Sequence, residues 1–235
     1  MHHTMWERII EHTRERELYI FSKYRGFMSF EGQVDISHIL EPELCLIINL
    51  NFHEDIFKNS FSKMEFIMAM DYLDPKIDEL HIDTLNVDTT HAKKPIRANS
   101  KGKELYEAIK HERKERLIPV TSEMDKQFIE QFSRKYDHSG NEIQSESKDV
   151  MLDTRIVHKI ESNSPGTIVF TGFKTDYEIL ASSITAEIMG YYSVVISDAT
   201  STYSERLFFS SLELMSQNLE VIDTRDLMKI WGYDQ

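Results

Sequence analysis

The sequence predicts a three-layer α/β domain built around a mostly parallel sheet of about six strands. Three observations support this prediction. Apolar runs without alternation, such as LCLIINL at 44–50 and TIVFTG at 167–172, indicate strands that are buried on both faces. Amphipathic segments between such runs indicate helices that cover the sheet. The length of 235 residues suits one such domain with an extension.

Each element is predicted from its local pattern, in chain order. The stretch 1–43 begins with an amphipathic segment in which Trp6, Ile9 and Ile10 stand near helical spacing, and it is predicted to be an N-terminal helical extension. The α/β domain is expected over 44–235. Strands are predicted at 44–50, 63–70, 116–120, 167–172, 193–198 and 219–223. Helices are predicted at 101–115, 123–136, 149–160, 175–189 and 204–217, with a last one ending near Trp231. Residues 71–100 read as irregular, and 137–148 as an inserted polar loop.

The composition excludes several classes of function. The chain has 27 basic and 40 acidic residues, a net charge of 27 − 40 = −13, which disfavours nucleic acid as a partner. No apolar run approaches the roughly 20 residues that span a bilayer, so no membrane partner is expected. Met1 to Trp6 lead directly into a charged segment, so no signal peptide is expected. The single cysteine, Cys45, rules out an internal disulfide and favours a reducing, cytoplasmic location.

A ligand is expected at one edge of the predicted sheet. In open α/β sheets, ligands bind beyond the carboxyl ends of the strands. The candidate ligand-binding residues are therefore those at the ends of the predicted strands, which are 49–51, 70–73, 120–122, 172–178 and 198–200.

The last third of the chain carries a recognisable pattern. It reads TIVFTGFKTDYEILASSITAEIMGYYSVVISDAT, with Gly172, Thr175, Asp176, Gly190, Tyr191, Asp198 and Ala199 at its fixed positions. An apolar strand, Gly-x-x-Thr-Asp-x-Cys, a helix, Gly-Tyr, an apolar strand and Asp-Ala form the pattern of the isochorismatase-like hydrolases. The sequence thus resembles this superfamily, which includes nicotinamidases and N-carbamoylsarcosine amidases. The resemblance covers about 44–230 and implies a Rossmann-like α/β fold.

The amidases of that superfamily use an Asp, a Lys and a Cys, and the resemblance implies that all three places are changed. Asn49 falls at the Asp place and Asn51 at a neighbouring Gln place. Thr121 or Ser122 falls near the Lys place, and Glu178 at the Cys place. A carboxylate is a weak nucleophile toward an amide, and an asparagine side chain cannot take a proton as an aspartate does. Superfamily members that cleave the isochorismate vinyl ether dispense with the Cys but keep the Asp.

A metal site is weakly indicated. Some members hold a metal through an Asp-x-His sequence after the second strand, and here Asp71 is present while Leu73 takes the His place. Asp74, His81 and His91 are further oxygen and nitrogen donors nearby, but no tight ligand spacing appears. Neither a metal nor another cofactor is therefore expected.

Two interpretations of Glu178 remain open. The tetrapeptide TDYE matches a capping box, in which Thr175 caps the helix and the Glu178 side chain returns to the Thr175 backbone N–H. The same signature recurs in TYSE at 202–205. Alternatively, Glu178 is a general acid or base, with Asp71 holding a metal or a water.

The leading functional hypothesis is a catalytically altered or inactive family member that acts in binding or protein interaction. Its small-molecule pocket would be lined by Asn51, Tyr72, Phe173, Thr175 and Tyr177. The alternative is a hydrolase of a small amide or related C–N bond that uses Glu178 and Asp71, with Asn49 and Ser122 at the remaining catalytic places. The Tyr and Trp residues of the extension favour contact between identical subunits.

Overall fold

The computed structural model describes residues 35–92, 104, 123–138, 140 and 142–233. By its internal contacts the chain divides into two units, Met1–Ile36 and Ser37–Gln235. The predicted N-terminal helix, the predicted helix at 101–115 except for Glu104, and the predicted strand at 116–120 lie outside the described residues.

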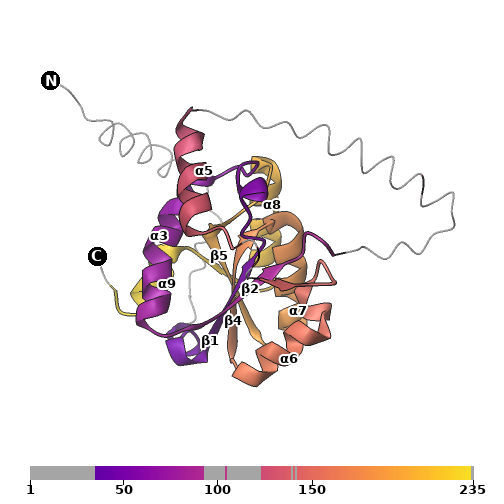
Figure 1. Cartoon of the computed structure of the whole chain (residues 1–235). Helices are drawn as coiled ribbons and strands as arrows, with labels where there is room; N and C mark the ends of the chain where they lie inside the picture. Colours follow the sequence, from indigo (N-terminus) through magenta and orange to yellow (C-terminus); the bar gives the residue numbers. More distant parts are fainter. Residues whose placement is uncertain (1–34, 93–103, 105–122, 139, 141, 234–235) are drawn as a thin grey trace. The chain divides into compact units, whose positions relative to one another are not determined.

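A six-stranded parallel sheet forms the centre of the second unit, in the order β3-β2-β1-β4-β5-β6 (Figure 1). The strands are β1 (Cys45–Leu50), β2 (Asp83–Asp88), β3 (Ile143–Gln144), β4 (Thr167–Phe173), β5 (Tyr192–Ser201) and β6 (Glu220–Ile222). Every residue of β1 and of β4 is buried, as their unbroken apolar runs predict. The α/β class and the parallel sheet are thereby confirmed.

Two predictions about the first half of the domain are wrong. Residues 63–70 are not a strand but the first half of helix α3 (Lys63–Glu79). Phe66, Met70 and Leu73 are buried at helical spacing, whereas Met68 faces solvent. The second strand is instead β2, which begins with exposed polar residues and lies in the stretch predicted to be irregular.

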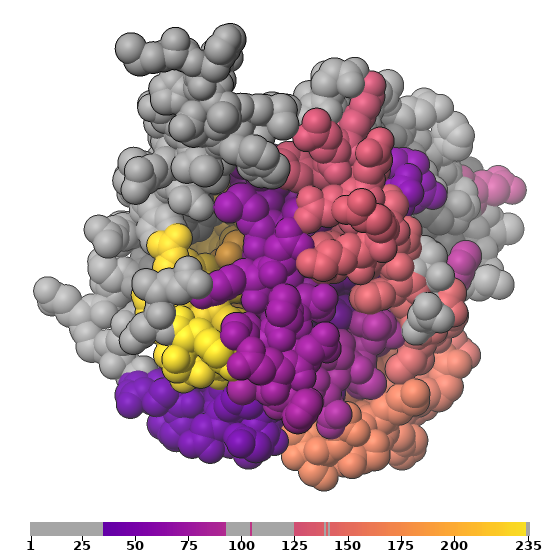
Figure 2. Space-filling view, turned by 60° about the vertical axis from the view of Figure 1, so that its left-hand side comes forward, coloured from indigo at the N-terminus to yellow at the C-terminus, as the bar shows by residue number. Residues whose placement is uncertain are grey.

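Helices cover both faces of the sheet. On one face, α6 (Thr154–Asn163), α7 (Leu180–Ile188) and α8 (Glu205–Ser216) enclose a core that includes Leu46, Ile48 and Leu50 of β1. The other face carries α3, α5 (Glu123–Lys135) and α9 (Thr224–Ile230), and Figure 2 shows α3 between α5 and α9. The short turns are η1 (Ser37–Ile39), η2 (Pro42–Leu44), α2 (Glu54–Phe57) and η3 (Val150–Leu152). Within the described ranges, no helix has the length and apolar character needed to cross a bilayer.

The motif glycine Gly172 allows β1 and β4 to approach each other closely. Its φ is +102°, and a Cβ atom there would lie 2.2 Å from the carbonyl oxygen of Leu50. Only glycine fits this position, because any side chain would collide with the backbone of β1. The constraint fixes how β4 ends, immediately before the residues that form the candidate site.

Candidate functional site

Asn49 lies within the sheet, in a row of polar side chains that crosses three strands. Its Nδ2 donates to Oδ1 of Asn86 in β2 at 2.8 Å, and its Oδ1 accepts from the hydroxyl of Thr171 in β4. The three residues share one register position. Both ends of the Asn49 amide are therefore occupied by neighbouring strands.

Asn51 stands just past the end of β1 and joins three strand ends. Its Oδ1 accepts from the backbone N–H of Thr89 at 2.7 Å and from the Thr89 hydroxyl at 3.1 Å. Its Nδ2 donates to the carbonyl oxygen of Phe173 at 2.7 Å. The φ of Asn51 is +56°, a left-handed conformation that asparagine tolerates better than most residues. Asn51 thus holds together the carboxyl ends of β1, β2 and β4.

Glu178 is a buried, ion-paired carboxylate, and the capping-box prediction is wrong. It belongs to a π-helical turn, η4 (Thr175–Ile179), whose cap position is Lys174 and which has no capping side chain. The backbone N–H of Ile179 donates to the Lys174 carbonyl at 3.1 Å, so the turn starts one residue before the predicted cap. Glu178 is 1% exposed, and its Oε1 lies 3.1 Å from Nζ of Lys148.

The second predicted capping box, at 202–205, does not form either. Ser204 occupies the cap position of α8 without a capping hydrogen bond. The hydroxyl of Thr202 donates instead to Oδ1 of Asp176. Both TDYE and TYSE match the sequence rule, but in each case a tertiary contact takes a side chain that the cap requires.

Lys148 is the residue that the sequence reasoning missed. It follows β3, which has only two residues and lies in the stretch predicted to be a loop. Besides its contact with Glu178, its Nζ donates to the Thr89 carbonyl at 2.7 Å. A chain of contacts therefore runs from Asn51 through Thr89 and Lys148 to Glu178, linking the ends of four strands. Thr121 and Ser122, the predicted occupants of the Lys place, lie outside the described residues.

Two polar atoms beside this ion pair are buried without a partner among the described residues. They are Oε2 of Glu178 and the hydroxyl oxygen of Thr175. Burial raises the pKa of Tyr203 to about 12, with a further contribution from the carboxylates of Glu178, Asp176 and Asp55. Among the described residues, the hydrogen bonds around Glu178 are thus incomplete.

A cluster of five phenylalanines closes the α3 side of the strand ends. Its members are Phe52, Phe57, Phe66, Phe132 and Phe173, and all are buried. The rings of Phe57 and Phe132 stack with centroids 4.2 Å apart, and Phe66 lies 4.6 Å from Phe173. Phe173, predicted to line a pocket, is therefore packed in this cluster.

Asp71 lies in the middle of α3 and not at a strand end. Its carboxylate accepts from Gln131 at 2.7 Å, from Lys135 at 2.6 Å and from the Tyr136 hydroxyl. Burial raises the pKa of Asp71, but these hydrogen bonds outweigh that effect and leave the pKa below its usual value. The contacts tie α3 to α5, and within the described ranges none joins Asp71 to Glu178. Tyr72, also in α3, is half-buried.

A second ionic group lies near the ends of β1 and β2. Nε2 of His53 is 3.2 Å from Oδ1 of Asp88 and 3.3 Å from Oε1 of Glu142. Burial raises the pKa of Glu142. No group of three or more His, Cys, Asp or Glu side chains within the described part of the chain is arranged to hold a metal ion.

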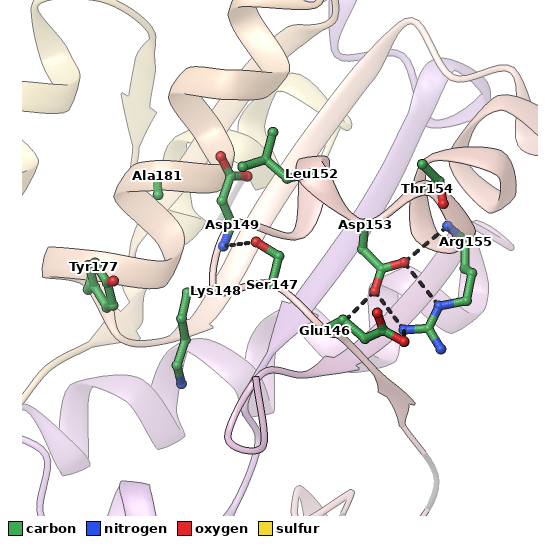
Figure 3. Close-up of a pocket in the computed structure, with 10 residues that line it drawn as sticks. All are labelled: Glu146, Ser147, Lys148, Asp149, Leu152, Asp153, Thr154, Arg155, Tyr177 and Ala181. Atoms are coloured by element: carbon green, nitrogen blue, oxygen red, sulfur yellow. Dashed lines mark hydrogen bonds and ion pairs between the residues drawn. The ribbon is translucent and has the colours of Figure 1, made fainter. Parts of the chain in front are cut away.

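The molecular surface is hollowed next to the ion pair (Figure 3). This depression has a volume of about 690 Å³. It is lined by Glu146, Ser147, Lys148, Asp149, Leu152, Asp153, Thr154, Arg155, Tyr177 and Ala181. Tyr177, predicted to line a pocket, is on its wall. Cys45, the only thiol of the chain, is buried within β1, and its pKa is raised to about 12 by burial and by Glu43.

A comparison with protein families decides the family. The isochorismatase domain model matches residues 87–226, more than half of the chain. This protein belongs to the isochorismatase family. The family signature runs along β4, α7 and β5 of the structure. Within it, Asp198 accepts from the backbone N–H of Thr224 at 2.9 Å and anchors the start of α9, and burial raises the pKa of Asp198 to about 6.

Several solved structures share the fold at low sequence identity. The nicotinamidase SaPncA of Staphylococcus aureus is 14% identical, with a TM-score of 0.52 over 77% of this chain and 99% of that one. The Escherichia coli YcaC gene product, described as an octameric hydrolase of unknown specificity, is 11% identical, with a TM-score of 0.55 over 87% of each chain. The MAR1 ribonuclease of Caenorhabditis elegans is 12% identical, with a TM-score of 0.54 over 82% of this chain and 83% of that one. No curated protein sequence matches this isochorismatase-family chain.

Proposed function

We propose that this isochorismatase-family protein binds a small molecule and does not perform the thiol-dependent amide hydrolysis of its family. The observation that carries the proposal is the ion pair between Lys148 and Glu178 at the corner where the family's cysteine is expected. A carboxylate is a weak nucleophile toward an amide, and this one already has an ammonium partner. The family's covalent step has no thiolate to begin it.

The remaining catalytic places support the same proposal. In the family pattern the lysine follows the third strand, and Lys148 follows β3, so we assign the Lys place to Lys148 in preference to Thr121 or Ser122. The Asp place is held by Asn49, whose side chain is an amide. An amide neither accepts nor releases a proton at neutral pH. The protein thus keeps the cation and lacks both the base and the nucleophile.

The unpartnered atoms near the ion pair favour ligand binding. A buried polar atom without a partner costs about 1–3 kcal/mol. Glu178 contributes one such atom and Thr175 another, both in η4. A ligand that donates an N–H or O–H to them would offset this cost. The depression has Lys148, the ion-pair partner of Glu178, in its lining.

The proposal is tested with the purified full-length chain and three substrates, nicotinamide, N-carbamoylsarcosine and isochorismate. We expect no turnover above that of a heat-denatured sample, and thermal stabilisation by at least one compound in a panel of small amides, amines and acids. Glu178→Ala should abolish that stabilisation, whereas Glu213→Ala, on the exposed side of α8, should not. Turnover by the wild type that is lost in Glu178→Ala contradicts the proposal.

A hydrolase with a carboxylate base is the second candidate, and one observation favours it. Oε2 of Glu178 is free within the described part of the chain to accept a proton from water. Asp71 would take no part, because its oxygens are held by α5. In this case Glu178→Gln lowers kcat by at least a hundredfold with little change in KM. The same assay therefore separates the two candidates.

We also propose that the protein is a cytoplasmic homo-oligomer. Apolar side chains are exposed on α8, at Leu207 and Leu214, and after α7, at Met189. The E. coli relative is described as octameric. Leu214→Asp should lower the mass measured by analytical ultracentrifugation, and a wild type that is monomeric at 100 µM contradicts this proposal. The net charge of −13 argues against nucleic acid as a partner.

A further inference from the structure

The carboxyl ends of the strands are closed on one side and open on the other. The five phenylalanines fill the α3 side. The depression lies on the opposite side, between the loop after β3, η3 and the helices α6 and α7. In Figure 3, Tyr177 and Lys148 stand at one end of it, and Arg155 with Glu146 and Asp153 at the other. A ligand that reaches Lys148 from the surface therefore meets this lining first.

Both cations of the lining already have carboxylate partners. Arg155 donates from Nη2 to Oδ2 of Asp153 at 2.7 Å and from Nε to Oδ1 at 3.1 Å, the bidentate geometry of a strong pair. This pairing helps to hold the pKa of Asp153 far below its usual value. Lys148 is held by Glu178 and by the Thr89 carbonyl. Neither cation is left to attract an anion.

The carboxylates in and behind the lining outnumber its cations. Glu146 and Asp149 stand in the lining in addition to Asp153 and to Glu178 behind Lys148, which makes four carboxylates against two cations, or 2 − 4 = −2. Glu146 shares Arg155 with Asp153, because its Oε1 lies 3.6 Å from Nη2 of Arg155. Oδ1 of Asp149 accepts from the backbone N–H of Met151 at 3.0 Å and Oδ2 accepts from the Thr185 hydroxyl at 2.6 Å, and no described cation lies within ion-pair distance of Asp149. Burial raises the pKa of Asp149, as expected for a carboxylate without a cationic partner. The depression therefore favours positive charge.

Apolar groups complete the lining. Leu152 is 67% exposed and Tyr177 is 40% exposed, so both present apolar surface within the lining. Ala181 lies one helical turn after Tyr177. A tyrosine ring binds cations over its face, and a leucine offers contact to an apolar body. The volume of about 690 Å³ is within the usual range for small-ligand pockets.

We propose that this depression binds a small organic cation, an amine or amidine attached to an apolar ring or chain. The cationic group would lie near Tyr177 and Asp149, and the apolar body against Leu152. This assignment names the ligand class for the binding function proposed above and rests on it. An acid such as isochorismate is the opposite class.

The test compares three probes of nearly the same shape and different charge. Isothermal titration with the full-length chain measures the Kd of benzamidine, a cation, benzamide, which is neutral, and benzoate, an anion. We expect benzamidine to bind at least tenfold more tightly than benzoate, with benzamide between them. The preference should shrink as salt rises from 50 to 500 mM. Equal binding of the three probes, or tighter binding of benzoate, overturns the inference.

Two variants with matched controls sharpen the test. Tyr177→Ala should raise the Kd of benzamidine at least fivefold, whereas Tyr233→Ala, near the carboxyl terminus, should leave this Kd unchanged. Lys148→Met removes a positive charge that repels the cationic probe, so it should lower the Kd of benzamidine about fivefold. Lys159→Met on α6 should leave this Kd unchanged. Tyr177 is partly exposed, so its variant is expected to fold even if Lys148→Met is unstable. Unchanged benzamidine binding in Tyr177→Ala contradicts the inference.

Failure of this inference and failure of the proposed function look different. If the wild type hydrolyses an amide, the non-hydrolytic function is wrong, and the charge preference of the three probes still reports on the depression. If neutral amides stabilise the protein while benzamidine does not bind, the binding function stands and the cation assignment is wrong.

Discussion

Besides the group of His53, Asp88 and Glu142, two groups of polar side chains lie near the ends of the strands, and they differ in how well their hydrogen bonds are satisfied. The amide group comprises Asn49, Asn51, Asn86 and Thr171, and none of its side-chain atoms is buried without a partner among the described residues. The ionic group comprises Lys148, Thr175 and Glu178, and it leaves two such atoms. Satisfied polar networks hold a single arrangement, whereas incompletely satisfied ones indicate a site that another molecule completes. This difference supports the proposal that the first group stabilises the fold and the second binds a ligand.

The largest effect is expected from Asn51→Ala in the amide group. The substitution removes three hydrogen bonds and places alanine at a φ of +56°. At about 1 kcal/mol for each bond and about 1 kcal/mol for the backbone, the free energy of unfolding should fall by about 4 kcal/mol. Urea titration followed by circular dichroism measures it. Asn59→Ala removes one exposed hydrogen bond and should cost less than about 1 kcal/mol. Equal losses of unfolding free energy in the two variants would contradict a structural role for the amide group.

Lys148→Met should have the next largest effect, because it leaves the Glu178 carboxylate buried without its cation. Breaking a fully buried pair costs about 3–5 kcal/mol, and we expect about 2–3 kcal/mol here, since Lys148 is 26% exposed. Adding Glu178→Gln to the same chain removes the isolated charge and should recover more than half of the loss. Lys159→Met, exposed on α6, should stay within about 0.5 kcal/mol of the wild type. A double variant no more stable than Lys148→Met would mean that the pair contributes nothing through charge.

The sequence predicts those parts of the fold that have a strong local pattern, and it does not predict those that depend on tertiary packing. β1, β4 and β5 are buried apolar runs, and their positions follow from the sequence. β2 begins with Asp83 and is exposed over its first residues, and β3 is two residues long, so neither carries a periodic pattern. α3 begins with a short apolar run that fits a buried strand as well as a helix. Its helical state is decided by packing against β5 and α5, which the local sequence does not contain.

The candidate site divides in the same way. Thr175 and Glu178 belong to a local motif, so the family resemblance locates them directly. Lys148 reaches Glu178 from a different strand, and its place depends on recognising β3. The capping box is wrong for a related reason: the sequence rule counts only local partners, and the Glu178 carboxylate has a tertiary one.

The smallest expected effect comes from replacing threonine by valine. This substitution can be made once in each group, at Thr171 and at Thr175, so it compares the two groups directly. Thr171→Val deletes a hydroxyl that donates to Asn49, leaves that acceptor buried, and should cost about 1–2 kcal/mol. Thr175→Val deletes a hydroxyl with no described partner in a residue that is equally buried, so it should change stability by less than about 0.5 kcal/mol or increase it. Valine has nearly the shape of threonine, so the difference between the two variants measures the hydrogen bonds alone. If Thr175→Val also raises the Kd of benzamidine, the Thr175 hydroxyl contributes to ligand binding and not to the stability of the fold. Equal destabilisation by both variants would mean that the Thr175 hydroxyl supports the structure as Thr171 does, and the division into two groups would fail.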